Sequence, residues 1–334
     1  MPITIAINGF GRIGRAALKI ALSHEDANVV AINDLGDIEN LAYLLRFDSV
    51  YGRYGVDVQV EGNCLIVGGK KITVLQEKDP ANLPWKEMAV DVVIESTGFF
   101  TEEDGACKHI TAGAKHVVVS APTKSEGIAT VVMGVNDDQL AGKDIVSNAS
   151  CTTNCAAPVM AVLHNVFGVE KALLTTAHAY TATQSLVDSP AKGDFRRGRA
   201  AAINMVPSST GAAIAATLTI PELKGKFDGI SLRIPVPVVS MSDITCVVSR
   251  DVTVEEVNNA FTEAVDNPMY QGVLAVSDSE AVSSDFIGDP HSAIVDLPLT
   301  RVVGGNLVKV MAWYDNEWGY SNRLIEQVLA VGKT

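Results

Sequence analysis

Cysteine is scarce in this sequence, and the count is odd. The 334 residues contain five cysteines, at Cys64, Cys107, Cys151, Cys155 and Cys246. An odd set in a chain of this size is a poor framework for structural disulfides, which favours a reducing compartment. Only Cys151 and Cys155 are close in sequence, and neither a second pair nor a histidine cluster accompanies them. We therefore expect neither zinc nor another bound metal.

Long apolar runs and positive charge are also lacking. No apolar run approaches the roughly 20 residues that cross a bilayer, and a strand-like pattern from residue 3 leaves no room for a signal peptide. We therefore expect a cytoplasmic protein without a membrane partner. Basic side chains number 26 against 39 acidic ones, a net charge of −13. Nucleic acid is not expected as the primary partner, because such binding needs basic residues to neutralise phosphates.

The first 150 residues show a pattern typical of a parallel α/β sheet. Short apolar runs at 3–8, 29–33, 90–95 and 116–120 alternate with helical patterns, as they do in successive βαβ units. Residues 56–75 resemble a small antiparallel meander with glycine turns. The sequence thus predicts a Rossmann-type parallel-sheet domain at the start of the chain.

The second half of the chain has a different character. Its expected elements are a helix from Cys151 to about 167, a strand over 170–181, an irregular arginine-bearing stretch to 206, strands near 228–250 and 291–314, and a last helix over 318–331. This order predicts an α+β catalytic domain with a mostly antiparallel sheet over 150–314. We expect the last helix, within 315–334, to complete the first domain, 1–149.

A glycine motif follows the first predicted strand. Gly9, Gly11 and Gly14 form G-x-G-x-x-G where a helix opens, and Asp34 ends the second strand. This context predicts a dinucleotide site: glycines let the backbone approach the pyrophosphate, and the acidic residue accepts from ribose hydroxyls. The carboxylate also repels a 2′-phosphate, which favours NAD. The alternative is that the glycines only shape a tight turn and Asp34 is solvated.

Cys151 opens a predicted helix. Unpaired amides and the helix dipole favour a thiolate there, so a lowered thiol pKa is expected, and the same amides can receive an oxyanion. His178 lies in the next strand, where it can return beside the thiol and exchange protons. On periodicity alone, both residues have a structural alternative as buried core side chains. Cys155, one turn further on, is expected to pack against the same helix face.

Taken together, five segments make the chain resemble the glyceraldehyde-3-phosphate dehydrogenases. They are residues 8–15 (NGFGRIGR), 147–155 (SNASCTTNC), 178–184, 207–213 and 313–320. The resemblance implies that Cys151 is the nucleophile and His178 its base. It further implies a thiohemiacetal that is oxidised with NAD and a thioester that inorganic phosphate cleaves to an acyl phosphate.

The resemblance also assigns binding residues. At NAD it implies Gly9, Gly11, Arg12, Ile13, Gly14, Asp34, Lys78, Thr97, Ser120 and Asn316. At glyceraldehyde 3-phosphate and phosphate it implies Ser150, Thr152, Thr181, Arg197, Thr210, Gly211 and Arg233. Strand-end capping is an alternative for Thr97 and Ser120. Arg196 and Arg199 are expected to be solvated or held in salt bridges between subunits.

The same family likeness implies a homotetramer and a role in glycolysis and gluconeogenesis. Ser189 stands where the family has Gly or Leu, and a serine nearby accompanies acceptance of NADP, so strict NAD preference is open. One rival is an erythrose-4-phosphate dehydrogenase, which releases an acid by hydrolysis; the pair Thr210 and Gly211 argues against it. The other is a non-catalytic NAD-binding regulatory protein, against which Cys151 and His178 argue.

Overall fold

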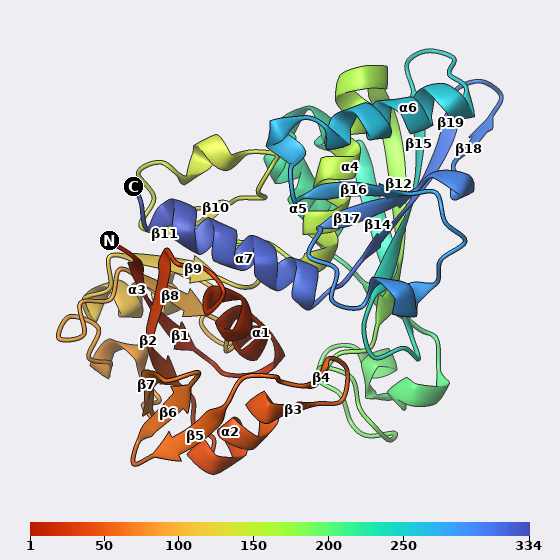
Figure 1. Ribbon diagram of the computed structural model, residues 1–334. Coiled ribbons are helices and arrows are strands. Elements are labelled where there is room, and N and C mark those ends of the chain that lie inside the picture. The colour runs from red at the N-terminus through yellow and green to blue at the C-terminus, as the bar shows by residue number, and fades with distance from the viewer. The chain divides into compact units, whose positions relative to one another are not determined.

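A nine-stranded sheet forms the first of two units into which the chain divides. The computed structural model describes residues 1–334. This unit comprises residues 1–131, 137–149 and 321–334 (Figure 1). Its strands are β1 (Ile3–Asn8), β2 (Ala27–Asn33), β5 (Val58–Glu61), β6 (Cys64–Val67), β7 (Lys70–Leu75), β8 (Val92–Glu95), β9 (His116–Val119), β10 (Ala129–Thr130) and β11 (Ile145–Ser147). A separate two-stranded ribbon pairs β3 (Phe47–Asp48) with β4 (Gly52–Arg53).

The pairing in this sheet confirms the predicted Rossmann-type arrangement. Its order is β10-β11-β9-β8-β1-β2-β7-β6-β5, and every pair from β10 to β7 is parallel. Val92, Val93 and Ile94 are fully buried in succession, as expected for a parallel strand covered on both faces. The predicted meander is also confirmed, because β5, β6 and β7 pair antiparallel and extend the edge drawn in orange in Figure 1.

Four helices accompany this sheet. They are α1 (Arg12–Ala21), α2 (Ile38–Arg46), α3 (Glu103–Thr111) and the larger part of α7 (Trp318–Val331). In α1, apolar residues recur at three- and four-residue spacing: Ala16, Ala17, Ile20 and Ala21 are buried, and Ile13 is half-buried. In α7, blue in Figure 1, Gln327 Nε2 donates to the carbonyl of Val131 at 3.2 Å, which places the helix beside the β10 edge.

An eight-stranded sheet forms the second unit, residues 132–136 and 150–320. Its strands are β12 (Val169–Ala179), β13 (Val206–Ser209), β14 (Phe227–Ile234), β15 (Ser240–Val248), β16 (Leu274–Ser277), β17 (Ala293–Asp296), β18 (Arg301–Val303) and β19 (Leu307–Tyr314). The order is β13-β14-β12-β15-β19-β17-β16, with β18 on β19. Only β12 with β14 and β16 with β17 run parallel, which confirms a mostly antiparallel sheet.

The central helix of the second unit is α4 (Cys151–Phe167). It packs on β15, β17 and β19 and against α5 (Ala212–Thr219) and α6 (Val254–Val265). Residues 152–163 are buried throughout. The helix ends where Gly168 adopts φ 69°, a left-handed conformation that glycine accepts at no steric cost. The bounds predicted for α4 and α7 from sequence are confirmed. None of the helices has the length and apolar character needed to span a membrane.

Candidate active site

The glycine loop between β1 and α1 is shaped by two positions that exclude a side chain. Gly9 has φ +95°, and a Cβ there would lie 2.6 Å from the Thr97 amide nitrogen. A Cβ on Gly14 would lie 2.1 Å from the carbonyl oxygen of Gly9. At Gly11, in contrast, nothing lies within 4 Å of the place a Cβ would take. The loop therefore packs against its own unit through Gly9 and Gly14 and leaves open space at Gly11.

Asp34 holds the glycine loop from the next strand end. Its carboxylate accepts from the amide of Phe10 at 2.7 Å and from the amide of Gly36 at 2.8 Å. Asp34 follows β2 directly, at the carboxyl ends of the parallel strands, where open α/β sheets bind ligands. The side chain thus fixes the backbone around the loop as well as facing the adjoining cavity.

A cavity of about 350 Å³ lies at these strand ends. Five residues predicted for the cofactor line it: Gly9, Gly11, Asp34, Lys78 and Thr97. A helix N-terminus with open space at its glycine loop is an anion site of the kind that a pyrophosphate needs. An acidic side chain in the same cavity suits a ribose. The residues present therefore fit a dinucleotide.

The other predicted cofactor residues have different surroundings. Arg12 forms an ion pair of 2.5 Å with Asp48 and lies over the ring of Tyr51. Ile13 is the second residue of α1, and Ser120 follows β9, with its amide bonded to the Glu95 carbonyl. Asn316 belongs to the second unit, where its side-chain oxygen accepts from Ser240 Oγ at 2.9 Å. That contact orients the amide so that its nitrogen is the end available to a ligand.

Cys151 and His178 meet in the second unit. Cys151 is the first residue of α4, and the preceding Ser150 caps the helix by accepting from the amide of Thr153 at 3.0 Å. His178, in β12, is buried and places Nε2 3.3 Å from Cys151 Sγ. Two contacts converge on its other nitrogen: Nδ1 lies 2.7 Å from the Ala179 carbonyl and 2.7 Å from Arg233 Nη1.

Burial is the largest influence on the pKa of both His178 and the Cys151 thiol. Burial, together with the charge of Arg233, lowers the pKa of His178 to about 3. Burial also raises the pKa of the Cys151 thiol, which Arg233 and the Thr152 contacts oppose only in part. The lowered thiol pKa expected from the helix start is therefore wrong for the isolated chain. The structure presents a protonated thiol beside a neutral imidazole.

Tyr314 is a site residue that the sequence reasoning missed. Its buried hydroxyl lies 2.9 Å from Thr152 Oγ1 and 2.9 Å from Thr176 Oγ1, and its ring meets that of His178 edge-on. It therefore connects the first turn of α4 to β12, the two elements that hold the thiol and the imidazole. Its position could have indicated this role, because Tyr314 ends β19 within residues 313–320, one of the five segments that carry the family resemblance.

Some predicted substrate residues gather near this pair. Arg233 contacts His178, while Ser150 and Thr152 flank Cys151. Gly211 caps α5, and the carbonyl of the next residue, Ala212, accepts from Thr153 Oγ1 at 3.5 Å. Thr210 Oγ1 accepts from the amide of Ala212, so the start of α5 adjoins the first turn of α4.

The remaining predicted substrate residues lie in or beside the irregular stretch after β12. Arg197 donates twice to Ser208 Oγ, at 2.9 and 2.7 Å, and Thr181 Oγ1 lies 2.9 Å from Thr183 Oγ1. Neither Arg197 nor Thr181 forms a hydrogen bond with Cys151. Arg199 has an exposed side chain and forms an ion pair with Asp188 of its own chain.

Comparisons with known proteins cover the whole chain. The family model for the glyceraldehyde 3-phosphate dehydrogenase NAD binding domain matches residues 3–103, and that for the C-terminal domain matches residues 150–316. The glyceraldehyde-3-phosphate dehydrogenase of Zymomonas mobilis is 50% identical over 337 residues, covering 100% of both chains. Glyceraldehyde-3-phosphate dehydrogenase 1 of Bacillus subtilis is 48% identical, over 100% of this chain and 99% of its own. The glyceraldehyde-3-phosphate dehydrogenase of Geobacillus stearothermophilus is 50% identical, over 98% of this chain and 97% of its own. Two matched domains and full-length identity of about one half leave one conclusion: this chain belongs to the glyceraldehyde-3-phosphate dehydrogenase family.

Proposed function

We propose that the chain catalyses the NAD-dependent oxidation and phosphorylation of glyceraldehyde 3-phosphate to 1,3-bisphosphoglycerate through a thioester on Cys151. The contact of Cys151 Sγ with His178 Nε2, at 3.3 Å and at the start of α4, carries this proposal. A nucleophile, a base and unpaired helix amides in one place are the elements of acyl chemistry.

His178 acts as the general base in this scheme. In the tautomer whose Nδ1–H is donated to the Ala179 carbonyl, Nε2 is unprotonated, so it takes the proton of the resting thiol as sulfur attacks the aldehyde carbon, and a thiohemiacetal forms on Cys151. The first amides of α4 face the resulting oxygen. When bound, the nicotinamide supplies the two-electron oxidant that turns the thiohemiacetal into a thioester. Inorganic phosphate then attacks the thioester carbonyl, the C–S bond breaks with its electron pair on sulfur, and the Cys151 thiolate regains its proton from His178 as the acyl phosphate leaves.

Two sets of residues bind the reactants. The cofactor residues are Gly9, Gly11, Arg12, Ile13, Gly14, Asp34, Lys78, Thr97, Ser120 and Asn316, supported for five of them by the cavity at the strand ends. The anion-binding residues are Ser150, Thr152, Thr181, Arg197, Thr210, Gly211 and Arg233. Arginine forks and threonine hydroxyls suit phosphate because they donate several hydrogen bonds to its oxygens.

We further propose a cytoplasmic homotetramer that serves glycolysis and gluconeogenesis. An uncovered apolar face on the second sheet supports association. Leu173 on β12 is 66% exposed, and Ile230 on β14 and Leu307 on β19 are exposed as well. Leu173 and Leu307 line a cavity of about 730 Å³ together with Ile214 and Leu218 of α5. Exposed apolar surface of this kind is typical of a subunit interface.

NADH formation from glyceraldehyde 3-phosphate tests the function. The wild-type chain should require phosphate or arsenate and prefer NAD to NADP. Cys151→Ala should lose activity, whereas the matched control Cys155→Ala, one helical turn away, should keep it. Turnover without either anion, or faster turnover with erythrose 4-phosphate, would support the hydrolysing rival. No turnover with either aldehyde would support the non-catalytic reading.

A further inference from the structure

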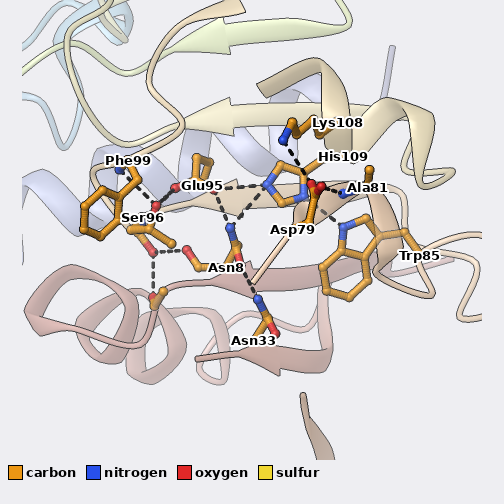
Figure 2. Close-up of polar contacts among 12 residues, drawn as sticks. Asn8, Asn33, Asp79, Ala81, Trp85, Glu95, Ser96, Phe99, Lys108 and His109 are labelled. Atoms are coloured by element: carbon orange, nitrogen blue, oxygen red, sulfur yellow. Dashed lines mark hydrogen bonds and ion pairs between the residues drawn. The ribbon is translucent and has the colours of Figure 1, made fainter. Parts of the chain in front are cut away.

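A buried polar cluster lies directly behind the wall of the dinucleotide cavity. Glu95 ends β8 and is 1% exposed, and around it lie Asn8, Thr97, His109 and Trp85. We call these five residues the Glu95 cluster. Figure 2 shows Asn8 and His109 both directed at the Glu95 carboxylate, with Trp85 behind the imidazole. The catalytic scheme proposed above does not use Glu95, His109 or Trp85.

Four donors converge on the Glu95 carboxylate. Oε2 accepts from Asn8 Nδ2 at 2.6 Å and faces His109 Nε2 at 3.0 Å. Oε1 accepts from the amide of Thr97 at 2.8 Å and from the Thr97 hydroxyl. Two donors on each oxygen are what an ionised carboxylate can accept, so the group is held in one orientation.

Trp85 fixes the tautomer of His109. An indole N–H is a donor only, and Trp85 Nε1 lies 3.0 Å from His109 Nδ1. Nδ1 therefore accepts, and the imidazole proton sits on Nε2, where it is donated to Glu95. Both rings are fully buried. The carboxylate is thus stabilised by hydrogen bonds from neutral groups rather than by a cation. Loss of any one of these partners would leave a buried polar group without a hydrogen bond, which is energetically costly.

The cluster controls the backbone that lines the cavity. Both polar hydrogens of Thr97 are used by Glu95, and Thr97 Oγ1 accepts from the amide of Phe99 at 3.1 Å. Gly9 packs so closely on Thr97 that no Cβ fits between them. Phe99, 86% exposed, lines the same cavity as Gly9 and Thr97. The hydroxyl of Thr97 is therefore committed to Glu95 and Phe99, so Thr97 contributes to the cofactor site by shaping the cavity wall rather than through its hydroxyl.

The opposite wall is tied to the same carboxylate. Asn8 donates to Glu95, and its side-chain oxygen accepts from Asn33 Nδ2 at 2.7 Å. Asn33 in turn accepts from the amide of Glu77 at 2.9 Å, and Glu77 lines the cavity. One buried charge thereby sets the positions of two walls that come from separate strand ends.

We propose that Glu95 is a positioning residue for NAD, acting through Thr97 and Asn8 to keep the cavity in its binding shape. This inference rests on the proposed cofactor site. Glu95→Gln places an N–H₂ group against fixed donors: one end faces the Thr97 amide, and the other faces Asn8 and His109. His109 cannot switch tautomer to accept, because Trp85 already donates to Nδ1. The substituted cluster therefore has no fully bonded arrangement.

The test is the dissociation constant of NAD for the full-length protein, measured by calorimetry. Glu95→Gln should raise it about 10- to 100-fold, because part of the binding free energy is then used to restore the shape of the cavity. At saturating NAD, kcat and the KM for glyceraldehyde 3-phosphate should stay within about threefold. Glu102→Gln, which removes an exposed carboxylate bonded to Ser125, is the matched control and should bind NAD normally.

If Glu95→Gln does not fold, a pair of variants at Thr97 tests the same inference. Thr97→Val removes the hydroxyl that joins Glu95 to Phe99 and should weaken NAD binding, whereas Thr97→Ser keeps the hydroxyl and should restore it. A folded Glu95→Gln protein that binds NAD within threefold of wild type would overturn the inference, as would equal binding by the two Thr97 variants. Binding is measured without turnover, so a wild type that binds NAD but oxidises no aldehyde would refute the proposed function alone.

Discussion

Gly11 and Gly14 of the glycine motif should respond differently to the same added methyl group. At Gly11 the backbone has φ −71° and ψ −156°, which any residue adopts, and the place of a Cβ is empty to 4 Å. Gly11→Ala should therefore change the free energy of unfolding by no more than about 1 kcal/mol. The methyl group would, however, occupy the space in which the loop amides meet a pyrophosphate. Losing one or two charge-assisted hydrogen bonds costs about 3 kcal/mol, so NAD should bind about 100-fold more weakly.

Gly14→Ala is the matched control. Its methyl carbon would lie 2.1 Å from the Gly9 carbonyl oxygen, so the loop or α1 must move, at a cost of roughly 3 kcal/mol or more. Urea unfolding without cofactor and calorimetric NAD titration separate the two effects. A Gly11→Ala protein that keeps its NAD affinity would refute the assignment of this loop to the pyrophosphate. Equal destabilisation of the two variants would refute the distinction between open and packed glycines.

Two further predictions concern the second unit. Tyr314→Phe leaves the hydroxyls of Thr152 and Thr176 without their shared partner. Urea unfolding should therefore show a free energy of unfolding that is lower by about 1–3 kcal/mol. An unchanged value would show that water replaces the tyrosine hydroxyl. Cys155 is fully buried and its pKa is raised to about 12, so almost none of it is thiolate at pH 8. Cys151 is partly exposed and lies 3.3 Å from His178 Nε2, which can take its proton, so iodoacetamide should modify Cys151 and spare Cys155; peptide mass spectrometry that finds Cys155 alkylated as fast as Cys151 would contradict this.

Local sequence signals predicted much of the fold. The glycine motif, the apolar spacing in α1 and the apolar run that makes up α4 each depend on neighbours along the chain. In the structure the bounds of α4 are set by local features, a serine cap at Ser150 and a left-handed glycine at Gly168, residue types that commonly begin and end helices. The parallel order of the first sheet followed from alternating strands and helices, because parallel strands need crossover connections.

Long-range contacts were not predictable in the same way. Glu95 ends β8, whereas His109 lies in α3, 14 residues further along the chain. From the sequence alone, a glutamate at a strand end is expected to be exposed to solvent. Tyr314 reaches Thr152 across 162 residues. The raised pKa of Cys151 cannot be predicted in this way, because the helix start is visible in the sequence, whereas the burial that outweighs it depends on the packing of α4 against β12 and β19.

The interleaving of the two units has a consequence for biosynthesis. Residues 321–334 belong to the first unit, with Leu324, Ile325 and Val328 fully buried, yet the ribosome makes them only after residues 150–320. A nascent chain that has produced the glycine loop and all nine strands of the first sheet must therefore leave part of that unit's apolar surface open until the second unit has emerged. Domains ordinarily fold in the order in which they are translated. Here the unit that begins the chain is the last to be completed.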